Sequence, residues 1–227
     1  MVRTIVGALI ICRFPGFDIK HRHISFVNAK IQQKHIVEDK ILEYPPGSSR
    51  VRIHAQVALC VALSTVLDIV SNALPLPRMP YGGTLSIATV PMIIIALRMG
   101  WRIGSITGVL YGIVALLREQ HFIHPIQLLL DYPLAFSTIG AAGIVRCGSW
   151  QQTDVRIRIR IGVAVVVANS LRFCAHFLSG IVFWYQFAAE GQSIWLYSLI
   201  YNASYMVPET IIGSILVQFL LRRLRFL

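Results

Sequence analysis

The chain has 227 residues, of which 56% are hydrophobic and only 14% are charged, and its mean hydropathy is +0.65. This composition excludes an ordinary soluble globular domain and is typical of a polytopic α-helical membrane protein. The formal net charge of +11 would suggest a nucleic-acid partner in a soluble protein. Here the basic residues lie mostly beside the apolar runs, where membrane topology explains them and no nucleic acid is needed.

Residues 1–50 differ in kind from the rest of the chain. The apolar run 5–12 is too short to span a bilayer, and it lacks a convincing signal-peptide cleavage site. The HRH triplet at 21–23 has no matching acid or cysteine nearby, so we assign it no metal. Residues 44–50 (YPPGSSR) have the composition of a linker. We expect an N-terminal extension that is poorly ordered or lies on the membrane surface, or a translation start near Val51.

From residue 51 onward, apolar runs predict an all-α integral membrane domain with six spans. The predicted spans cover about 55–74, 84–97, 101–117, 123–145, 157–187 and 193–221. Between the first two spans, residues 75–83 (PLPRMPYGG) are rich in proline and are expected to form an irregular loop.

The distribution of arginine predicts the orientation of this bundle. One set of connections and ends carries Arg50, Arg52, Arg98, Arg102, Arg146, Arg156, Arg158, Arg160, Arg222, Arg223 and Arg225. The opposite connections carry only Arg78 and Arg118, and the connection 188–193 carries none. By the positive-inside rule, both ends of the six-span domain are predicted to be cytoplasmic.

The region 172–202 carries polar and aromatic side chains at helical spacing. His176, Gly180 and Trp184 fall at i, i+4 and i+8, so on a helix they form one stripe. After a break at 188–193 the chain turns back, which places Tyr197 and Asn202 in the outer third of the sixth span. These groups are predicted to line a pocket within roughly 15 Å of the outer surface.

Asp131 is predicted to lie at the same depth, eight residues into the fourth span. An isolated ionisable group costs about 2.5–3.5 kcal/mol at the centre of a membrane helix, so it indicates a function or a partner. The nearest candidate partners are His121 and His124. A cationic ligand would supply the missing charge, and the rings of Trp184 and Tyr81 would favour it by cation–π attraction of ~2 kcal/mol when desolvated.

Several of these residues also have a purely structural interpretation. A tryptophan near a span end is often an interfacial anchor, and a single intramembrane histidine is often hydrogen-bonded within the bundle. Arg172 and Glu209 fall near the middle of antiparallel spans and are predicted to form a structural pair beneath the pocket. Ala58 and Ala62 have the spacing that lets another helix approach closely, within this chain or from a partner.

Two kinds of motif do not occur in the sequence. The cysteines Cys12, Cys60, Cys147 and Cys174 show no metal-binding spacing. No GxxxxGK[ST] motif occurs, so the chain has no nucleotide-binding site of that type and any ATP-driven work requires a partner.

Three segments together resemble a known family. HPIQLLLDYPLAF (124–136), AHFLSGIVFW (175–184) and WLYSLIYN (195–202) resemble the thiamine-specific S-component (ThiT family) of energy-coupling factor (ECF) transporters, over about residues 55–221. The resemblance implies a prokaryotic plasma-membrane protein with the six-helix S-component fold. It also implies high-affinity capture of thiamine outside, no cofactor, and a complex with a transmembrane coupling protein and two ATPases.

The resemblance also implies roles for individual residues. His176 and Trp184 correspond to the pair that sandwiches the thiazolium ring, and Tyr197 and Asn202 to the groups that hold the aminopyrimidine. The remaining assignments place Gly180 and Tyr132 near the hydroxyethyl arm and Ala58 and Ala62 at the coupling protein.

Three positions depart from the family pattern. Asp131 stands where the family usually has Glu, so its bond to the aminopyrimidine is expected to be longer or bridged by water. His121 replaces a Tyr of the third outer loop. The Trp of the loop before the second span is missing, with Gly82 near its place and Tyr81 beside it. The last two departures affect the loops that form a lid over the ligand and part of the affinity.

Two alternatives stay open from the residues alone. The first is an S-component for a related vitamin or for a free pyrimidine or thiazole precursor, although a ligand without a thiazole would make poor use of His176 and Trp184. The second is a membrane-embedded enzyme that uses His176 and Asp131 as acid and base. No nucleophile, metal cluster or second acid is predicted to join these two residues, which disfavours an enzyme.

Overall fold

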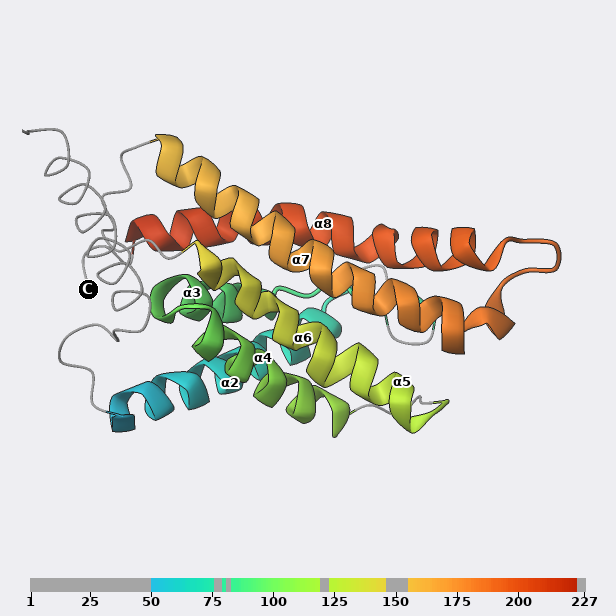
Figure 1. Cartoon of the computed structure of the whole chain (residues 1–227), viewed down its shortest axis with the longest axis horizontal. Helices are drawn as coiled ribbons and strands as arrows, with labels where there is room; N and C mark the ends of the chain where they lie inside the picture. The colour runs from blue at the N-terminus through green and yellow to red at the C-terminus, as the bar shows by residue number, and fades with distance from the viewer. Residues whose placement is uncertain (1–49, 76–78, 81–82, 119–122, 146–154, 224–227) are drawn as a thin grey trace, which may run out of the picture. The chain divides into compact units, whose positions relative to one another are not determined.

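The computed structural model describes residues 50–75, 79–80, 83–118, 123–145 and 155–223 as a bundle of helices (Figure 1). Residues 1–49 of the predicted N-terminal extension lie outside the described residues, whereas Arg50 is the first residue of α2. In chain order the elements are α2 (Arg50–Ala73), α3 (Thr89–Met99), α4 (Trp101–Leu116), α5 (Pro125–Leu129), η2 (Leu130–Leu134), α6 (Ala135–Ser137), η3 (Thr138–Ile144), α7 (Val155–Phe183), η4 (Tyr185–Phe187) and α8 (Ile194–Arg223).

All six predicted spans fall on helical segments, but the segments differ in length. Among the described residues, α2, α7 and α8 are long and apolar enough to cross a membrane. The helix α3 has 11 residues and α4 has 16. Because a helix rises about 1.5 Å per residue, α3 reaches only about 17 Å, short of a hydrocarbon core of ~30 Å.

The second span begins later than predicted. We expected helix from residue 84, but residues 83–88 are not helical and α3 starts at Thr89. Pro91 gives a physical reason: in the first turn of a helix its missing N–H needs no partner, whereas further inside it would break the helix. The connection before α3 is held against α2, because the Ile87 N–H donates to Ser71 Oγ at 3.4 Å.

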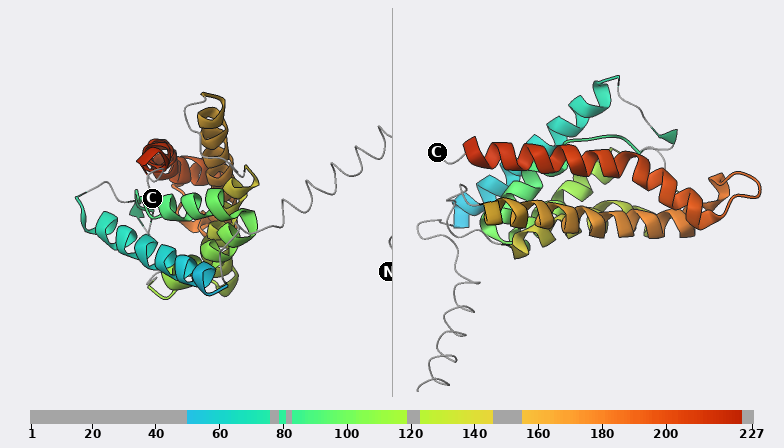
Figure 2. Two further views of the ribbon diagram at one scale, coloured as in Figure 1. Left: turned by 90° about the vertical axis from the view of Figure 1, so that its left-hand side faces the viewer. Right: turned by 90° about the horizontal axis from the view of Figure 1, so that it is seen from above.

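The long helices α7 and α8 run antiparallel along the bundle (Figures 1 and 2). Figure 1 shows the start of α2, the start of α7 and the end of α8 at the same end of the molecule, and the α7–α8 connection at the other. This arrangement is the one that the predicted topology requires.

Glycines on α4 let this helix approach the fourth span closely. Gly104, Gly108 and Gly112 fall at i, i+4 and i+8 and therefore share one face. A Cβ atom on Gly108 would lie 2.1 Å from the Phe136 carbonyl oxygen, and one on Gly112 would lie 2.7 Å from the Tyr132 carbonyl oxygen. The backbones thus meet without intervening side chains, a packing mode typical of membrane helices.

Replacing Gly108 with alanine is expected to destabilise the bundle, because the backbone at Phe136 must shift to admit the methyl group. We expect a loss of about 1–3 kcal/mol, the usual range for overpacking, measured as a lower melting temperature in detergent. Gly162→Ala is the matched control, since its Cβ would meet only the Gln218 side chain at 3.6 Å. Equal melting temperatures of the two variants would contradict this account of the packing.

Candidate functional site

A cavity of about 760 Å³ lies between α2, the connection 83–88, α4, the fourth span, α7 and α8. This volume is in the range of small-molecule sites. The predicted ligand-binding residues that line it are Asp131, Tyr132, His176, Gly180, Trp184, Tyr197 and Asn202. The other two predicted ligand-binding residues, Tyr81 and His121, lie outside the described residues.

A π-helical turn in the fourth span presents Asp131 and Tyr132. The turn covers Leu130–Leu134 and contains Pro133. Proline cannot donate the usual helical hydrogen bond and its ring clashes with the carbonyl of residue i−4, so the turn widens around it. Such turns often occur at functional sites, and here the widened turn is the part of the fourth span that carries the acid.

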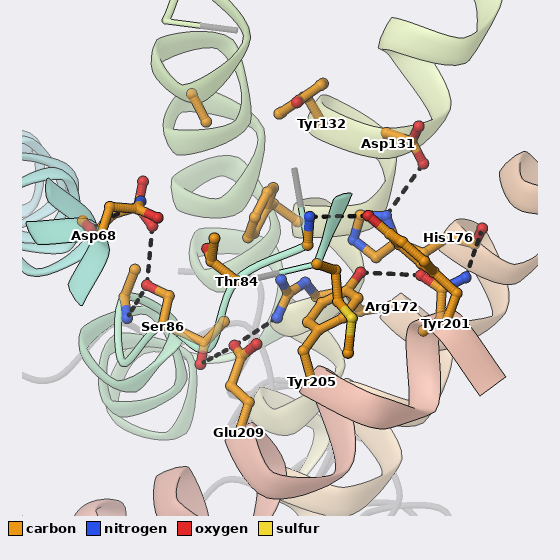
Figure 3. Close-up of a pocket in the computed structure, with 18 of the residues that line it drawn as sticks. Asp68, Thr84, Ser86, Asp131, Tyr132, Arg172, His176, Tyr201, Tyr205 and Glu209 are labelled. Atoms are coloured by element: carbon orange, nitrogen blue, oxygen red, sulfur yellow. Dashed lines mark hydrogen bonds and ion pairs between the residues drawn. The ribbon is translucent and has the colours of Figure 1, made fainter. Parts of the chain in front are cut away.

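Asp131 is the acceptor for three protein donors. Gln127 Nε2 and Ser179 Oγ each donate to Asp131 Oδ2 at 2.7 Å, and His176 Nδ1 lies 3.1 Å from Oδ1 (Figure 3). We expected His121 or His124 as the nearest partners, but His124 instead caps α5 by accepting from the Ile126 N–H at 3.1 Å. The Asp131 carboxylate therefore belongs to a hydrogen-bond network formed within the protein itself.

The contact with Asp131 orients the His176 ring. A carboxylate only accepts hydrogen bonds, so the proton of a neutral imidazole must lie on Nδ1. This leaves Nε2 as an acceptor. Within the described part of the chain, Nε2 is buried without a hydrogen-bond partner, on a side chain that lines the cavity. An unsatisfied buried polar atom of this kind is a natural contact for a ligand or a water molecule.

Aromatic rings contribute other parts of the lining. Trp184 lies directly after the end of α7 and packs against Phe187 with ring centroids 5.6 Å apart. Tyr197 packs against Tyr201 on α8 at 5.9 Å. The Tyr201 hydroxyl accepts from the Gly83 N–H at 3.0 Å and so ties the connection before α3 to α8.

Asn202 and Gly180 line the cavity where α8 meets α7. The Asn202 amide nitrogen donates to the Ser198 carbonyl at 2.9 Å, and its oxygen accepts from the Tyr205 hydroxyl at 2.9 Å. A Cβ atom on Gly180 would lie 2.1 Å from Ser198 Oγ, so a glycine is needed for the helices to approach. Much of the hydrogen-bonding capacity of Asn202 is therefore used within the protein.

Arg172 and Glu209 are paired as the depth argument predicted, with Arg172 Nη1 2.6 Å from Glu209 Oε1. They line the cavity instead of lying wholly beneath it. The Thr89 hydroxyl donates to the same carboxylate oxygen at 3.2 Å, and the guanidinium lies 4.7 Å from the centre of the Phe136 ring. Both side chains are almost completely buried.

The sequence did not allow several other residues of the cavity lining to be predicted as site residues. Asp68 on α2 pairs with Arg118, which follows α4, and accepts a hydrogen bond of 2.9 Å from Ser86. An acid inside a predicted span was the available signal for Asp68. Gln127 and Ser179 gave no such signal, because neutral polar residues are common in membrane helices and their contact with Asp131 depends on how the helices are rotated.

The alanines assigned to a partner interface lie on the outside of the bundle. Ala58 and Ala62 are both exposed on α2, beside exposed Leu59 and Val66. The described helices therefore leave this face of α2 uncovered.

Comparisons with known proteins agree on one family. A family model described as thiamine transporter protein matches residues 54–227. The chain is 40% identical over 167 residues to the thiamine transporter ThiT of Bacillus subtilis, covering 71% of this chain and 86% of that protein. It is 25% identical over 145 residues to ThiT of Lacticaseibacillus paracasei, covering 60% and 72% respectively.

A solved structure of ThiT from Listeria monocytogenes superposes with a TM-score of 0.68 at 23% identity, covering 78% of this chain and 96% of that chain. This likeness confirms the predicted all-α membrane fold. The bundle is that of a multi-pass membrane protein.

Proposed function

The chain belongs to the thiamine transporter protein family, a family of transporters and not of enzymes, and we propose that it is the membrane subunit that captures thiamine. Two relatives are named as thiamine transporters. The observation that carries the proposal is the cavity itself, which brings Asp131, His176 and Trp184 together from the fourth span, α7 and the residue after α7.

The cavity offers what the chemistry of thiamine requires. Thiamine is a small organic cation with a thiazolium ring, an aminopyrimidine ring and a hydroxyethyl arm. The Asp131 carboxylate supplies negative charge, and the indole of Trp184 supplies a π face that attracts cations. Polar side chains at a few positions in a largely aromatic and apolar lining give orientation, as in other small-molecule sites.

We infer that this subunit works with a transmembrane coupling protein and two ATPases, as the ECF S-component resemblance implies. The exposed small-residue face of α2 at Ala58 and Ala62 supports this part of the proposal, because it permits close approach of another helix. Co-purification of the chain with such a complex tests it, and a chain that transports thiamine alone would overturn it.

Thiamine is expected to quench the intrinsic fluorescence of the purified chain at concentrations below about 1 μM. The chain has four tryptophans, and Trp184 lines the cavity, whereas Trp101 and Trp195 are exposed on the bundle. Trp184→Phe is therefore expected to remove most of the quenching. Trp195→Phe is the matched control and is expected to keep it.

The titration also separates thiamine from its fragments. We expect free aminopyrimidine and free thiazole to bind more weakly than thiamine, because each occupies only part of the cavity. If thiamine does not change the fluorescence, and a fragment or another vitamin does, the proposed function is wrong.

A further inference from the structure

The Asp131 carboxylate is held by donors from the fourth span and from α7, and two of them converge on the same oxygen. Gln127 Nε2 and Ser179 Oγ both donate to Oδ2 at 2.7 Å. The other oxygen, Oδ1, lies 3.1 Å from His176 Nδ1 (Figure 3). A ligand that enters the cavity therefore meets a carboxylate whose orientation the protein has already set.

The two oxygens of Asp131 differ in the hydrogen-bonding capacity that they keep for a ligand. A carboxylate offers about four lone-pair positions, which is about two for each oxygen. Among the described residues, Oδ2 receives two donors and Oδ1 receives one. Oδ2 is therefore filled, and Oδ1 keeps a position for a donor from the ligand.

Gln127 is itself held in the orientation that its contact with Asp131 requires. Its Oε1 accepts from the Ile123 N–H at 3.3 Å, so Nε2 is the end of the amide that faces the carboxylate. The Gln127 residue is only 1% exposed. Because both ends of the amide are engaged within the fourth span, Gln127 acts on Asp131 as a fixed donor.

Ser179 supplies the second donor to Oδ2 from α7. It lies three residues after His176, so both side chains point to the same side of α7 and reach the same carboxylate. Ser179 is completely buried, and within the described part of the chain it lies outside the cavity lining. Any influence of Ser179 on a bound ligand must therefore be transmitted by Asp131.

We propose that Ser179 and Gln127 are positioning residues for the ligand. By filling Oδ2 they hold the carboxylate so that Oδ1 accepts an N–H of the ligand. In thiamine the pyrimidine amine carries the N–H donors, so this arrangement makes the site selective for an amine over a carbonyl at that position. The inference rests on the proposed function, and it requires no contact between Ser179 and thiamine.

The test compares thiamine with oxythiamine, in which a carbonyl oxygen replaces the pyrimidine amine. Ser179→Ala removes one donor from Oδ2, so the carboxylate can rotate and Oδ1 is no longer held toward the amine. We expect thiamine to bind about 10-fold more weakly, the loss of one hydrogen bond to a charged group, and oxythiamine to change by less than about 2-fold.

Ser64→Ala is the matched control for this variant. It makes the same change at a completely buried serine of α2 that lies outside the described cavity lining. We expect it to leave the affinities for both ligands unchanged, because Ser64 has no contact with Asp131 among the described hydrogen bonds.

A merely structural role of Ser179 predicts a different result. If Ser179 only stabilised the packing of α7 against the fourth span, a folded Ser179→Ala protein would lose affinity for both ligands equally or for neither, and either result would overturn the inference. Equal binding of thiamine and oxythiamine by the unmodified protein would also overturn it. If the unmodified chain does not bind thiamine at all, the proposed function fails.

Gln127→Met tests the same oxygen from the fourth span and serves if Ser179→Ala does not fold. Methionine keeps the length of the side chain and removes the Nε2 donor. We expect the thiamine-to-oxythiamine affinity ratio to narrow several-fold, with Gln218→Met, at a partly buried position of α8 outside the described cavity lining, as the matched control. An unchanged ratio in a folded Gln127→Met protein would contradict the proposed role of Oδ2.

Discussion

Replacing Arg172 with alanine is expected to leave little folded protein in the membrane. The substitution strands the Glu209 carboxylate, which is 3% exposed. Among the described residues, this carboxylate would retain only the Thr89 hydroxyl as a donor. Breaking a buried ion pair from one side typically costs 3–5 kcal/mol, a large fraction of the stability of a typical domain. The same change also removes the packing of the guanidinium over Phe136.

The yield of monodisperse protein after detergent extraction, together with its melting temperature, measures this effect. Arg102→Ala is the matched control, because Arg102 lies on the exposed side of α4 over the Trp101 ring. The double variant Arg172→Met, Glu209→Gln is expected to recover part of the loss, since it removes both charges together. An Arg172→Ala variant with the same melting temperature as the unmodified protein would show that the pair does not stabilise the bundle.

The general architecture could be predicted from the sequence because apolar length determines membrane spans. The runs around α2, α7 and α8 are long enough to be recognised without any knowledge of packing. The start of α3 and the π turn at Leu130–Leu134 were not predicted. Both depend on where a proline falls within a helix, at Pro91 and Pro133, and hydropathy does not register this.

The sequence could predict how deep in the membrane the candidate site lies, but not the contacts between its side chains. Helical rise places Asp131 and His176 at similar depth, whereas their contact depends on the rotation of two helices about their axes. That rotation is set by packing, such as the close approach at Gly180 and Ser198. Asp68 and Arg118 are 50 residues apart, and no local pattern joins them. Neutral partners such as Ser179 become visible only when the helices are assembled.

Asp131→Asn is expected to weaken thiamine binding about 10- to 100-fold, the loss that corresponds to one charge-assisted hydrogen bond. The asparagine removes the negative charge and places an N–H₂ group among three former donors. If this group faces His176 Nδ1, the imidazole proton must move to Nε2, which then presents a donor to the ligand space. The variant therefore changes both the charge of the cavity and the His176 atom that lines it.

Titration of the Asp131→Asn and Asp131→Glu variants with thiamine, and with a neutral analogue in which carbon replaces the thiazolium nitrogen, separates these two effects. Asp131→Glu keeps the charge and is expected to retain most of the affinity. If the carboxylate acts mainly by its charge, Asp131→Asn weakens thiamine binding more than binding of the neutral analogue. If it acts mainly by orienting His176, both ligands lose affinity equally. Unchanged affinity for both ligands in a folded Asp131→Asn protein would remove Asp131 from the site.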